Sequence, residues 1–303
     1  MGSQNRGVAV VGSANLDVVF TVDRLPRPGE TIHSRSSATY PGGKGLNQAV
    51  AASRAGARTV FIGAVGNDSS GDVLAQTMTD AGIDGALLRR SDEPTGQAFI
   101  VLDDQAENTI ILTAGANGTV TALTPAERAT VAASSVLLMQ LELPASVVAD
   151  AASAARTAGT TVMLNAAPAQ PLPPDLVAEL DYLIVNEPEA CIIGGSENLD
   201  DASAALAGRI PRLIVTLGAR GSVLYDRGEL LCRIPARPVQ ALDTTGAGDT
   251  FCGAFAAAIA EGRTMVEAAE FATAAASLAV QVLGAVPSVP LRAAIEAAVQ
   301  GRE

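Results

Sequence analysis

The chain has 303 residues, a formal net charge of −12 and a pI of about 4.6. Hydrophobic residues make up 48% and charged residues 17%, which indicates a globular protein with a large core and excludes a disordered chain. Nucleic acids and anionic membranes attract basic surfaces, so we expect neither as a partner of this acidic chain.

The N-terminal region predicts one buried strand followed by a small lid. Residues 8–12 are a short apolar run typical of a buried strand, and 18–22 continue as extended chain. The preceding MGSQNRG lacks the apolar stretch of a signal peptide. The loose alternation of 31–40 predicts short strands at an edge. We expect these strands to belong to a small β lid formed by parts of about 15–42 and 95–115.

From residue 41 on, apolar strands alternate with helices, which favours a parallel sheet covered on both faces. Residues 221–236 predict a hairpin, and we expect a single domain over 1–303. The uncharged stretch 271–291 is interrupted by Gly and Pro, which indicates a buried helix rather than a membrane span. Strands are predicted at 8–12, 59–66, 135–141, 161–165, 181–186 and 212–218, and helices at 41–57, 70–82, 145–158, 187–194, 266–282 and 291–299.

Polar side chains follow the predicted strands where the strands end. Asn15 and Asp17 follow the first strand, and Glu142, Asn186 and Thr216 end or follow later ones. Ligands of open parallel sheets bind beyond the carboxyl ends of the strands. Asn15, Asp17 and Glu142 therefore form a candidate set for sugar hydroxyls, although each could also be a cap or turn residue.

The segment 239–260 is the clearest candidate for a catalytic centre. Gly246, Ala247 and Gly248 stand where an apolar helix begins, and the first N–H groups of a helix lack intrahelical partners. These donors make an anion site, and Asp249 adds a carboxylate beside it. The pair suits phosphoryl transfer, with the carboxylate accepting the proton of the acceptor hydroxyl. The alternative is an Asp cap on a buried helix.

A second glycine turn, GGKGLN at 42–47, contains Lys44, the only lysine of the chain. It lacks the Ser or Thr that follows the lysine of a Walker A motif. Its glycine backbone and Asn47 could meet substrate hydroxyls while Lys44 reaches toward phosphate; the alternative is a plain turn before a helix. No GxGxxG follows the first strand, which argues against a nicotinamide-dependent dehydrogenase.

The remaining candidates concern metals and thiols. Asn186 and Glu189 are three residues apart at a predicted helix start, where they could face a hydrated Mg²⁺ or simply cap the helix. The single histidine, His33, is expected at the surface. Three cysteines without metal-ligand spacing indicate reduced thiols and a cytoplasmic protein.

The motifs of the chain resemble those of the ribokinase-like (PfkB) carbohydrate kinases, most closely the members that phosphorylate ribose. The similar segments cover the full length, and the two glycine turns lie about two hundred residues apart. In order they are GSANLD, PGGKGLNQAVAASRAG, GAVGND, LMQLELP, NAAPA, NEPEA, TLGARG, DTTGAGDTFCGAF and GAVPSVP.

This resemblance implies an α/β fold: a three-layer α/β/α sandwich with a mostly parallel central sheet and a β-sheet lid, often shared across a homodimer. It also implies ATP- and Mg²⁺-dependent phosphorylation of a sugar hydroxymethyl group, with activation by K⁺. We expect the acceptor to be the primary hydroxyl of D-ribose, giving D-ribose 5-phosphate and ADP.

The resemblance further implies roles for individual residues. Asp249 would be the base and Gly246, Ala247 and Gly248 the anion hole. Ribose would be held by Asn15, Asp17, Gly43, Lys44, Asn47 and Glu142. Nucleotide and Mg²⁺ would be bound by Asn186, Glu189, Thr216, Gly218, Gly221, Gly248 and Thr273. K⁺ would lie between loops offered by Asp243, Thr245, Ala279, Val282, Gly284 and Ser288.

Two positions depart from the family pattern. Leu46 replaces a small residue and either crowds the sugar pocket or packs beneath it, and Thr273 stands where His or Asn would be familiar near adenine. Other acceptors therefore stay open: deoxyribose, a ketohexose, 2-keto-3-deoxygluconate or a nucleoside. A non-catalytic sugar-binding protein on the same scaffold is a further alternative. Apolar lid residues such as Ile32 and Tyr40 favour a homodimer through the lid.

Overall fold

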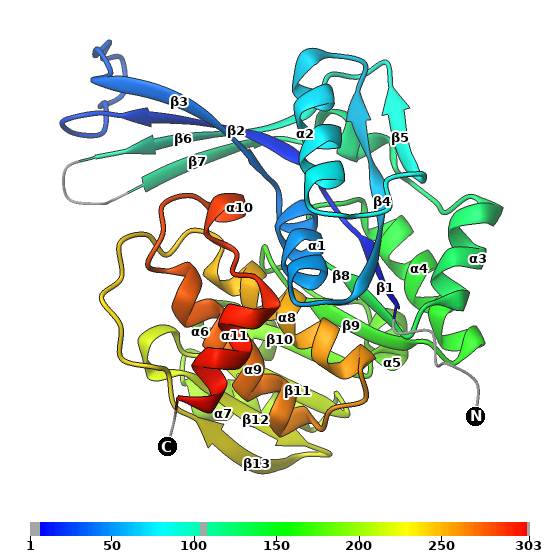
Figure 1. Ribbon diagram of the computed structural model, residues 1–303. Coiled ribbons are helices and arrows are strands. Elements are labelled where there is room, and N and C mark those ends of the chain that lie inside the picture. The colour runs from blue at the N-terminus through cyan, green and yellow to red at the C-terminus, as the bar shows by residue number, and fades with distance from the viewer. Residues whose placement is uncertain (1–6, 104–107, 302–303) are drawn as a thin grey trace.

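The structure is a computed structural model that describes residues 7–103 and 108–301, so most of the MGSQNRG segment lies outside the described residues. Its centre is a nine-stranded sheet of order β13-β12-β11-β10-β9-β8-β1-β4-β5, parallel from β11 to β5 (Figure 1). The strands are β1 Gly7–Val11, β4 Arg58–Gly66, β5 Leu88–Ser91, β8 Val136–Met139, β9 Thr161–Asn165, β10 Tyr182–Asn186, β11 Arg212–Thr216, β12 Ser222–Asp226 and β13 Glu229–Ile234.

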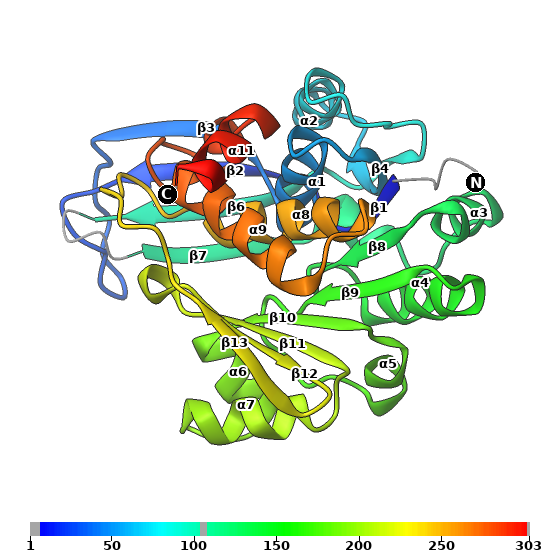
Figure 2. The same ribbon diagram turned by 60° about the horizontal axis from the view of Figure 1, so that its bottom comes forward.

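Helices cover both faces of this sheet (Figure 2). The helices are α1 Lys44–Arg54, α2 Ser69–Asp80, α3 Pro125–Ala133, α4 Ala145–Ala158, α5 Pro174–Glu179, α6 Glu187–Gly194, α7 Leu199–Ala207, α8 Ala247–Ala260, α9 Met265–Ala279, α10 Ala285–Ser288 and α11 Arg292–Gln300, with short 3₁₀ turns η1 Gly115–Thr119 and η2 Gly218–Arg220.

The alternation of side chains along the strands divides the core into two layers. Val8 and Val10 belong to the layer that includes residues of α1, α8, α9 and α11, whereas Ala9 and Val11 belong to the layer that includes residues of α3, α4, α5 and α7. Both faces are apolar because both are covered, which is why the strands are continuous hydrophobic runs. The predicted three-layer sandwich is confirmed.

A second, four-stranded sheet projects from the carboxyl end of β1 (Figure 1). Its order is β3-β2-β6-β7, with β2 parallel to β6 and the outer pairs antiparallel. Its strands are β2 Asn15–Thr21, β3 Ser36–Gly42, β6 Gly96–Leu102 and β7 Asn108–Thr113. Because β2 starts and β3 ends beside β1, the polar residues at 15–17 and the glycine turn at 42–45 lie together.

Local chemistry explains most element boundaries. The hairpin β12–β13 turns on Arg227 and Gly228, both at positive φ as a two-residue hairpin turn requires. Helix α9 ends at Ala279, earlier than the predicted Val282, because the Val280 carbonyl accepts the N–H groups of Leu242 and Asp243. Across the described ranges, none of the helices has the length and apolar character needed to cross a membrane.

Candidate active site

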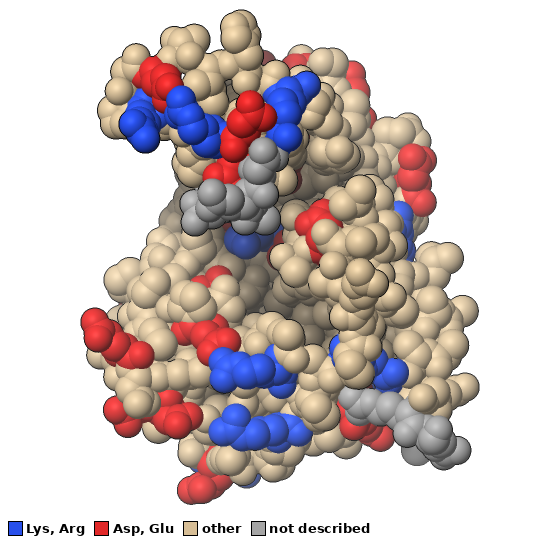
Figure 3. All heavy atoms as spheres, turned by 90° about the vertical axis from the view of Figure 1, so that its left-hand side faces the viewer, with Lys and Arg blue, Asp and Glu red and all other residues tan. Residues whose placement is uncertain are grey.

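The carboxyl ends of the parallel strands face the small sheet and the start of α8. Figure 3 shows a hollow between the overhanging sheet and the main body, with acidic and basic side chains around its rim. Asn15 and Glu142 come to this edge from beyond β1 and β8, and Asn186 and Thr216 end β10 and β11. The structure thus brings the polar residues predicted after the strands to one edge.

Helix α8 begins at Ala247, with Gly246 as its N-cap at φ 74°. Thr250 makes the first bond of the helix, donating its N–H to the Gly246 carbonyl at 2.8 Å. The Ala247 N–H already donates to the Thr244 carbonyl at 3.2 Å, so it is engaged in the turn. The Gly248 backbone is exposed, and a Cβ built there would meet no atom within 4 Å. Open backbone at Gly248 therefore lies beside the Asp249 carboxylate.

Asp249 is buried and held by two amide groups of α1. The Asn47 Nδ2 donates to Oδ2 at 3.0 Å, and the Gln48 Nε2 donates to Oδ1 at 2.9 Å. Lys44 lies one turn earlier, and the Asp249 carboxylate raises the pKa of its ammonium while burial opposes this. The Asn47 Oδ1 is buried with no hydrogen-bond partner among the described residues, so it can still receive a donor.

The candidate sugar residues Glu142 and Asn15 are each held by a neighbouring segment. Glu142 accepts the Ser13 hydroxyl at 2.5 Å and the Lys44 N–H at 3.1 Å. Asn15 is oriented by Asn117 of η1, whose Nδ2 donates to the Asn15 Oδ1 at 2.7 Å. Hydrogen bonds therefore join four segments that are far apart in sequence, at residues 13–15, 44, 117 and 142.

Burial, together with the Glu142 and Asp249 carboxylates, raises the pKa of Asp17 to about 7. Lys44 opposes this rise. Gly43 has φ 87°, and a Cβ there would lie 2.7 Å from the Asn15 backbone nitrogen, so only glycine lets this turn approach β2. This part of the cleft is closely packed.

Leu46 does not enter this group. Its side chain is fully buried in the core layer formed with α8, so it packs beneath the glycine turn. Three further polar residues lie behind Asp249 and have no role in our sequence interpretation. They are Gln48, Gln140 and Asn165. Gln140 and Asn165 sit at the ends of β8 and β9, so the argument from strand ends that found Glu142 could have found them.

The predicted nucleotide residues form a more open group. Asn186 and Glu189 make a complete capping box on α6, with 2.8 Å bonds in both directions. The two residues therefore cap the helix. The Glu189 Oε1 and the Asn186 Nδ2 take no part in these two capping hydrogen bonds. Burial raises the pKa of Glu189.

The other nucleotide candidates lie in η2 and α9. Gly218 starts η2 at φ 55° in open space, whereas a Cβ on Gly221 would strike the Ile234 carbonyl. The Thr216 hydroxyl donates to the Val185 carbonyl at 3.3 Å. Thr273 is buried in α9, and its Oγ1 has no hydrogen-bond partner among the described residues.

The candidate K⁺ residues lie in two adjoining loops joined by Asp243. Its Oδ1 accepts the Thr245 N–H at 2.9 Å and its Oδ2 accepts the Gly284 N–H at 2.8 Å. The Ala279 carbonyl accepts the Val282 N–H at 3.1 Å. The buried Ser288 hydroxyl donates to the Ala285 carbonyl at 2.8 Å. All the ligating atoms available here are oxygens, which fits the donor chemistry of an alkali cation.

Magnesium has fewer protein ligands on offer. Within residues 7–103 and 108–301, no three His, Cys, Asp or Glu side chains cluster in a way that could hold a metal ion. The Glu189 carboxylate, facing Lys44 and Asp249, is a hard oxygen ligand of the kind Mg²⁺ prefers. This residue fits a hydrated ion that takes its remaining ligands from water and phosphate.

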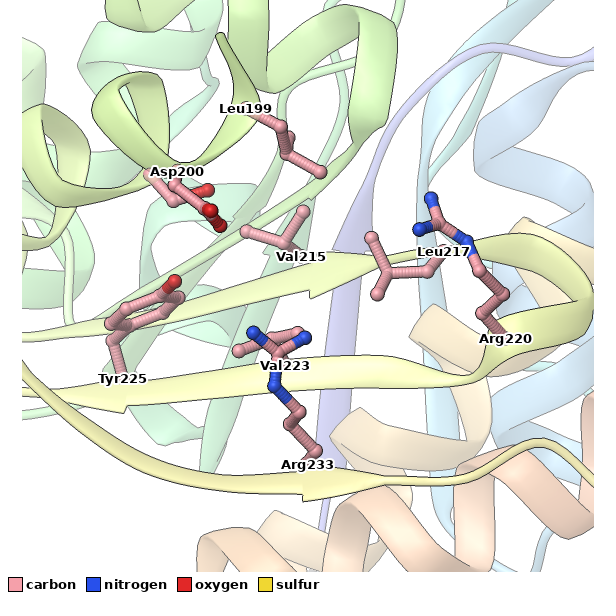
Figure 4. Close-up of a pocket in the computed structure, with 9 residues that line it drawn as sticks. Leu199, Asp200, Val215, Leu217, Arg220, Val223, Tyr225 and Arg233 are labelled. Atoms are coloured by element: carbon pink, nitrogen blue, oxygen red, sulfur yellow. The ribbon is translucent and has the colours of Figure 1, made fainter.

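A separate cavity of about 260 Å³ opens between α7 and the strands β11 to β13 (Figure 4). Arg220 and Arg233 extend over a floor that includes Val215 and Val223, and Tyr225 lies to one side (Figure 4). None of the predicted site residues lines this cavity. Arg220 instead pairs with Glu187, which ties η2 to the start of α6.

Comparisons with known proteins identify the family of the chain. The family model of the pfkB family carbohydrate kinases matches residues 5–292. A ribokinase from Haemophilus influenzae is 41% identical over 293 residues, covering 94% of this chain and 95% of that protein. A ribokinase from Bacillus subtilis is 37% identical, covering 96% and 98%. The solved structure of Arabidopsis thaliana ribokinase complexed with ribose and ATP has a TM-score of 0.91 at 36% identity, covering 97% and 98%.

These matches confirm the family resemblance seen in the motifs, and with it a kinase rather than a dehydrogenase or a non-catalytic protein. They span nearly the whole chain, including both glycine turns and the small sheet. The chain belongs to the pfkB family of carbohydrate kinases.

Proposed function

We propose that the protein transfers the γ-phosphoryl group of ATP to the primary hydroxyl of D-ribose, giving D-ribose 5-phosphate and ADP. The observation that carries this proposal is the placement of Asp249. Its carboxylate is buried in the first turn of α8, bonded to Asn47 and Gln48 and adjacent to open backbone at Gly248. The ribokinase relatives, one solved with ribose and ATP, supply the acceptor.

In this proposal Asp249 acts as the general base. It takes the proton of the ribose hydroxymethyl group while that oxygen forms a bond to the γ-phosphorus. The bond from this phosphorus to the β–γ bridging oxygen breaks, and ADP leaves. Each Asp249 oxygen accepts one amide bond, so a lone pair remains on either oxygen for the substrate proton. The N–H groups at Gly246 and Gly248 stabilise the charge on the moving group, whereas that of Ala247 would first have to leave Thr244.

Asn15, Asp17, Asn47 and Glu142 would bind the ribose hydroxyls, with the Gly43 backbone close by. Lys44 would neutralise phosphate charge from the same turn. Thr216, Gly218, Gly221 and Thr273 would line the nucleotide side. The orphaned Thr273 Oγ1 supports this placement, because a buried hydroxyl without a partner is costly unless a ligand satisfies it.

We propose that the protein binds two metal ions, Mg²⁺ and K⁺. Asn186 and Glu189 would hold Mg²⁺ through water, and the ion would neutralise charge on the ATP phosphates. Asp243, Thr245, Ala279, Val282, Gly284 and Ser288 would hold K⁺. Asp243 bonds to the loop that leads into α8, so a cation held there would order the turn before Gly246.

We further propose that the small sheet is the lid of a single kinase domain, and that two lids meet in a homodimer. Ile110, Ile111 and Leu112 on β7 are each about half exposed or more, and Tyr40 on β3 is also exposed. Exposed apolar strands at a sheet edge are typical of an interface. Free thiols at Cys191, Cys232 and Cys252 suit a reducing compartment, and we propose the cytoplasm.

The test is ADP release from ATP and Mg²⁺ with a panel of acceptors, with and without K⁺. We expect rapid turnover on ribose that K⁺ increases. The panel contains deoxyribose, fructose, 2-keto-3-deoxygluconate and a nucleoside. Preferred turnover on one of these would keep the chemistry and replace the acceptor; no turnover on any sugar or nucleoside would remove the proposal.

A further inference from the structure

Three buried amide side chains lie behind Asp249, and the reaction described above gives them no task. Gln48 Nε2 donates to Asp249 Oδ1 at 2.9 Å and to Asn165 Oδ1 at 3.0 Å. Gln140 Nε2 donates to Gln48 Oε1 at 2.6 Å, and Asn165 Nδ2 donates to the Ile184 carbonyl at 3.1 Å. Gln48 therefore uses both amide hydrogens and its oxygen inside the protein.

The direction of this hydrogen-bond chain follows from the ionised carboxylate. A carboxylate only accepts, so Gln48 has to turn its NH₂ group toward Asp249. Its Oε1 then faces away and needs a donor, which Gln140 supplies. With Gln48 in this orientation, a donor rather than an acceptor faces Asp249.

Backbone packing holds this arrangement in place. Gly253 lies one turn after Asp249 on α8, and a Cβ there would strike the Gln48 carbonyl and lie 2.5 Å from the Ala51 Cβ. A Cβ on Gly12, beyond β1, would strike Gln140 Oε1. Glycines at these two positions let α8 approach α1, and Gln140 approach Gln48. Gln140 follows β8 and Asn165 ends β9. The carboxyl ends of these two strands therefore fix the end of the hydrogen-bond network that lies away from Asp249.

We propose that Gln48, oriented by Gln140 and Asn165, is a positioning residue for Asp249. It holds the carboxylate in the rotamer that faces the acceptor hydroxyl and keeps a hydrogen-bond donor against it, so that the carboxylate is ready to accept a proton. This inference rests on the proposed phosphoryl transfer, in which Asp249 is the base.

A purely structural role is the competing explanation, because a buried amide network also stabilises a fold. The two roles differ in what they change. Loss of a structural network lowers the unfolding temperature and leaves the pH profile in place. Loss of a positioning group lowers kcat more than it changes KM, and it moves the acid limb of the profile.

The test compares Gln48→Met, Gln48→Glu and a matched control. Gln48→Met keeps the length of the side chain and removes the donor. Gln48→Glu places a second carboxyl group against Asp249, and repulsion between two carboxylates favours the form of the pair that keeps one proton. The control is Gln76→Glu on α2, where an exposed glutamine likewise donates to an aspartate, Asp80, at 2.7 Å.

We expect Gln48→Met to lower kcat by about 10- to 100-fold, with the KM values for ATP and ribose changed less than about threefold. In Gln48→Glu we expect the acid limb of kcat to move up by about one pH unit or more, with activity partly recovered at alkaline pH. Four other titratable groups interact electrostatically with Asp249 and also affect the pH profile: Asp17, Lys44, Glu189 and Cys252. The pH profile of each variant is therefore compared with that of the wild type. Gln76→Glu should leave kcat and the profile unchanged.

A Gln48→Met enzyme with wild-type kcat, or a Gln48→Glu enzyme with an unmoved acid limb, would overturn the proposal. If Gln48→Met does not fold, Gln140→Met, which removes only the donor that orients Gln48, gives the same comparison of kcat with KM. A crystal structure of Gln48→Met gives a readout that does not need turnover: the Asp249 carboxylate should leave its wild-type rotamer. Wild-type protein without turnover would remove the proposed function instead, and the rotamer result would stand apart from it.

Discussion

The two halves of the cleft are held in different ways. In the acceptor half, Asn15, Asn47 and Asp249 are buried and joined by side-chain hydrogen bonds to other segments. In the nucleotide half, Asn186 and Gly218 are exposed, and the Asn186–Glu189 bonds stay within one helix start. The acceptor half is therefore organised before any ligand binds. Under the proposed assignment, selection of the acceptor is built into the fold, whereas Asn186 and Gly218 would offer exposed groups to the phosphates of ATP.

The largest expected effect on kcat comes from removing the charge of Asp249. Asp249→Asn should lower kcat by about 10²–10⁴-fold while ATP still binds, because the proposed base is lost and the helix turn remains. Glu189→Gln, the same change in the nucleotide half, should lower kcat by only about 3- to 10-fold and raise the KM for Mg-ATP. Steady-state kinetics and calorimetry with ATP measure both. Near-normal turnover by Asp249→Asn would contradict the mechanism.

A pair of glycine substitutions tests the rigidity of the two halves. A Cβ on Gly45 would lie 2.5 Å from the Ser13 nitrogen and 2.6 Å from the Gly12 carbonyl carbon, all backbone atoms. Gly45→Ala should therefore cost about 2–3 kcal/mol of unfolding free energy and reduce activity, since α1 must move. A Cβ on Gly218 would lie in open space, and the only cost is the left-handed φ of 55°. Gly218→Ala should therefore lower the unfolding free energy by about 1 kcal/mol. Urea unfolding of both variants gives the comparison; equal costs would mean that the halves are equally rigid.

The sequence predicted the features that depend on local patterns and missed those that depend on contacts between distant segments. The mostly parallel sheet covered by helices and the candidate base Asp249 followed from local patterns: apolar runs alternating with helices, and a glycine turn entering a helix. The Gln140–Gln48–Asn165 chain did not, because it depends on α1 and two strand ends meeting over separations of 92 and 117 residues. Leu46 was ambiguous for a related reason. Its direction depends on how α1 is rotated, and only the packing of α1 against α8 decides that.

A smaller effect concerns pH and Asp17. Because burial and nearby carboxylates raise its pKa to about 7, half of the free protein carries a proton on Asp17 near neutral pH. Hydroxyl donors of ribose bind the ionised form, so binding should release a proton. The Kd for ribose should then rise about tenfold from pH 8 to pH 6. Calorimetry at pH 6 in two buffers of different ionisation enthalpy measures the release. Asp17→Asn should bind more weakly with a flat profile; a wild-type Kd independent of pH would contradict this assignment.

The smallest effect is expected at the outer edge of the nucleotide half. Arg220 and Glu187 pair across η2 and α6, but their side chains are 66% and 36% exposed, so water and salt screen the pair. Arg220→Gln should therefore leave the unfolding midpoint unchanged within error and raise the KM for ATP by less than about threefold. The measurement is ATP-dependent turnover at low and high ionic strength, with the exposed Arg156→Gln on α4 as a matched control. A large rise in KM for Arg220→Gln alone would mean that Arg220 contacts the nucleotide directly. The nucleotide half would then depend on specific side chains as the acceptor half does, and the contrast between the two halves would be lost.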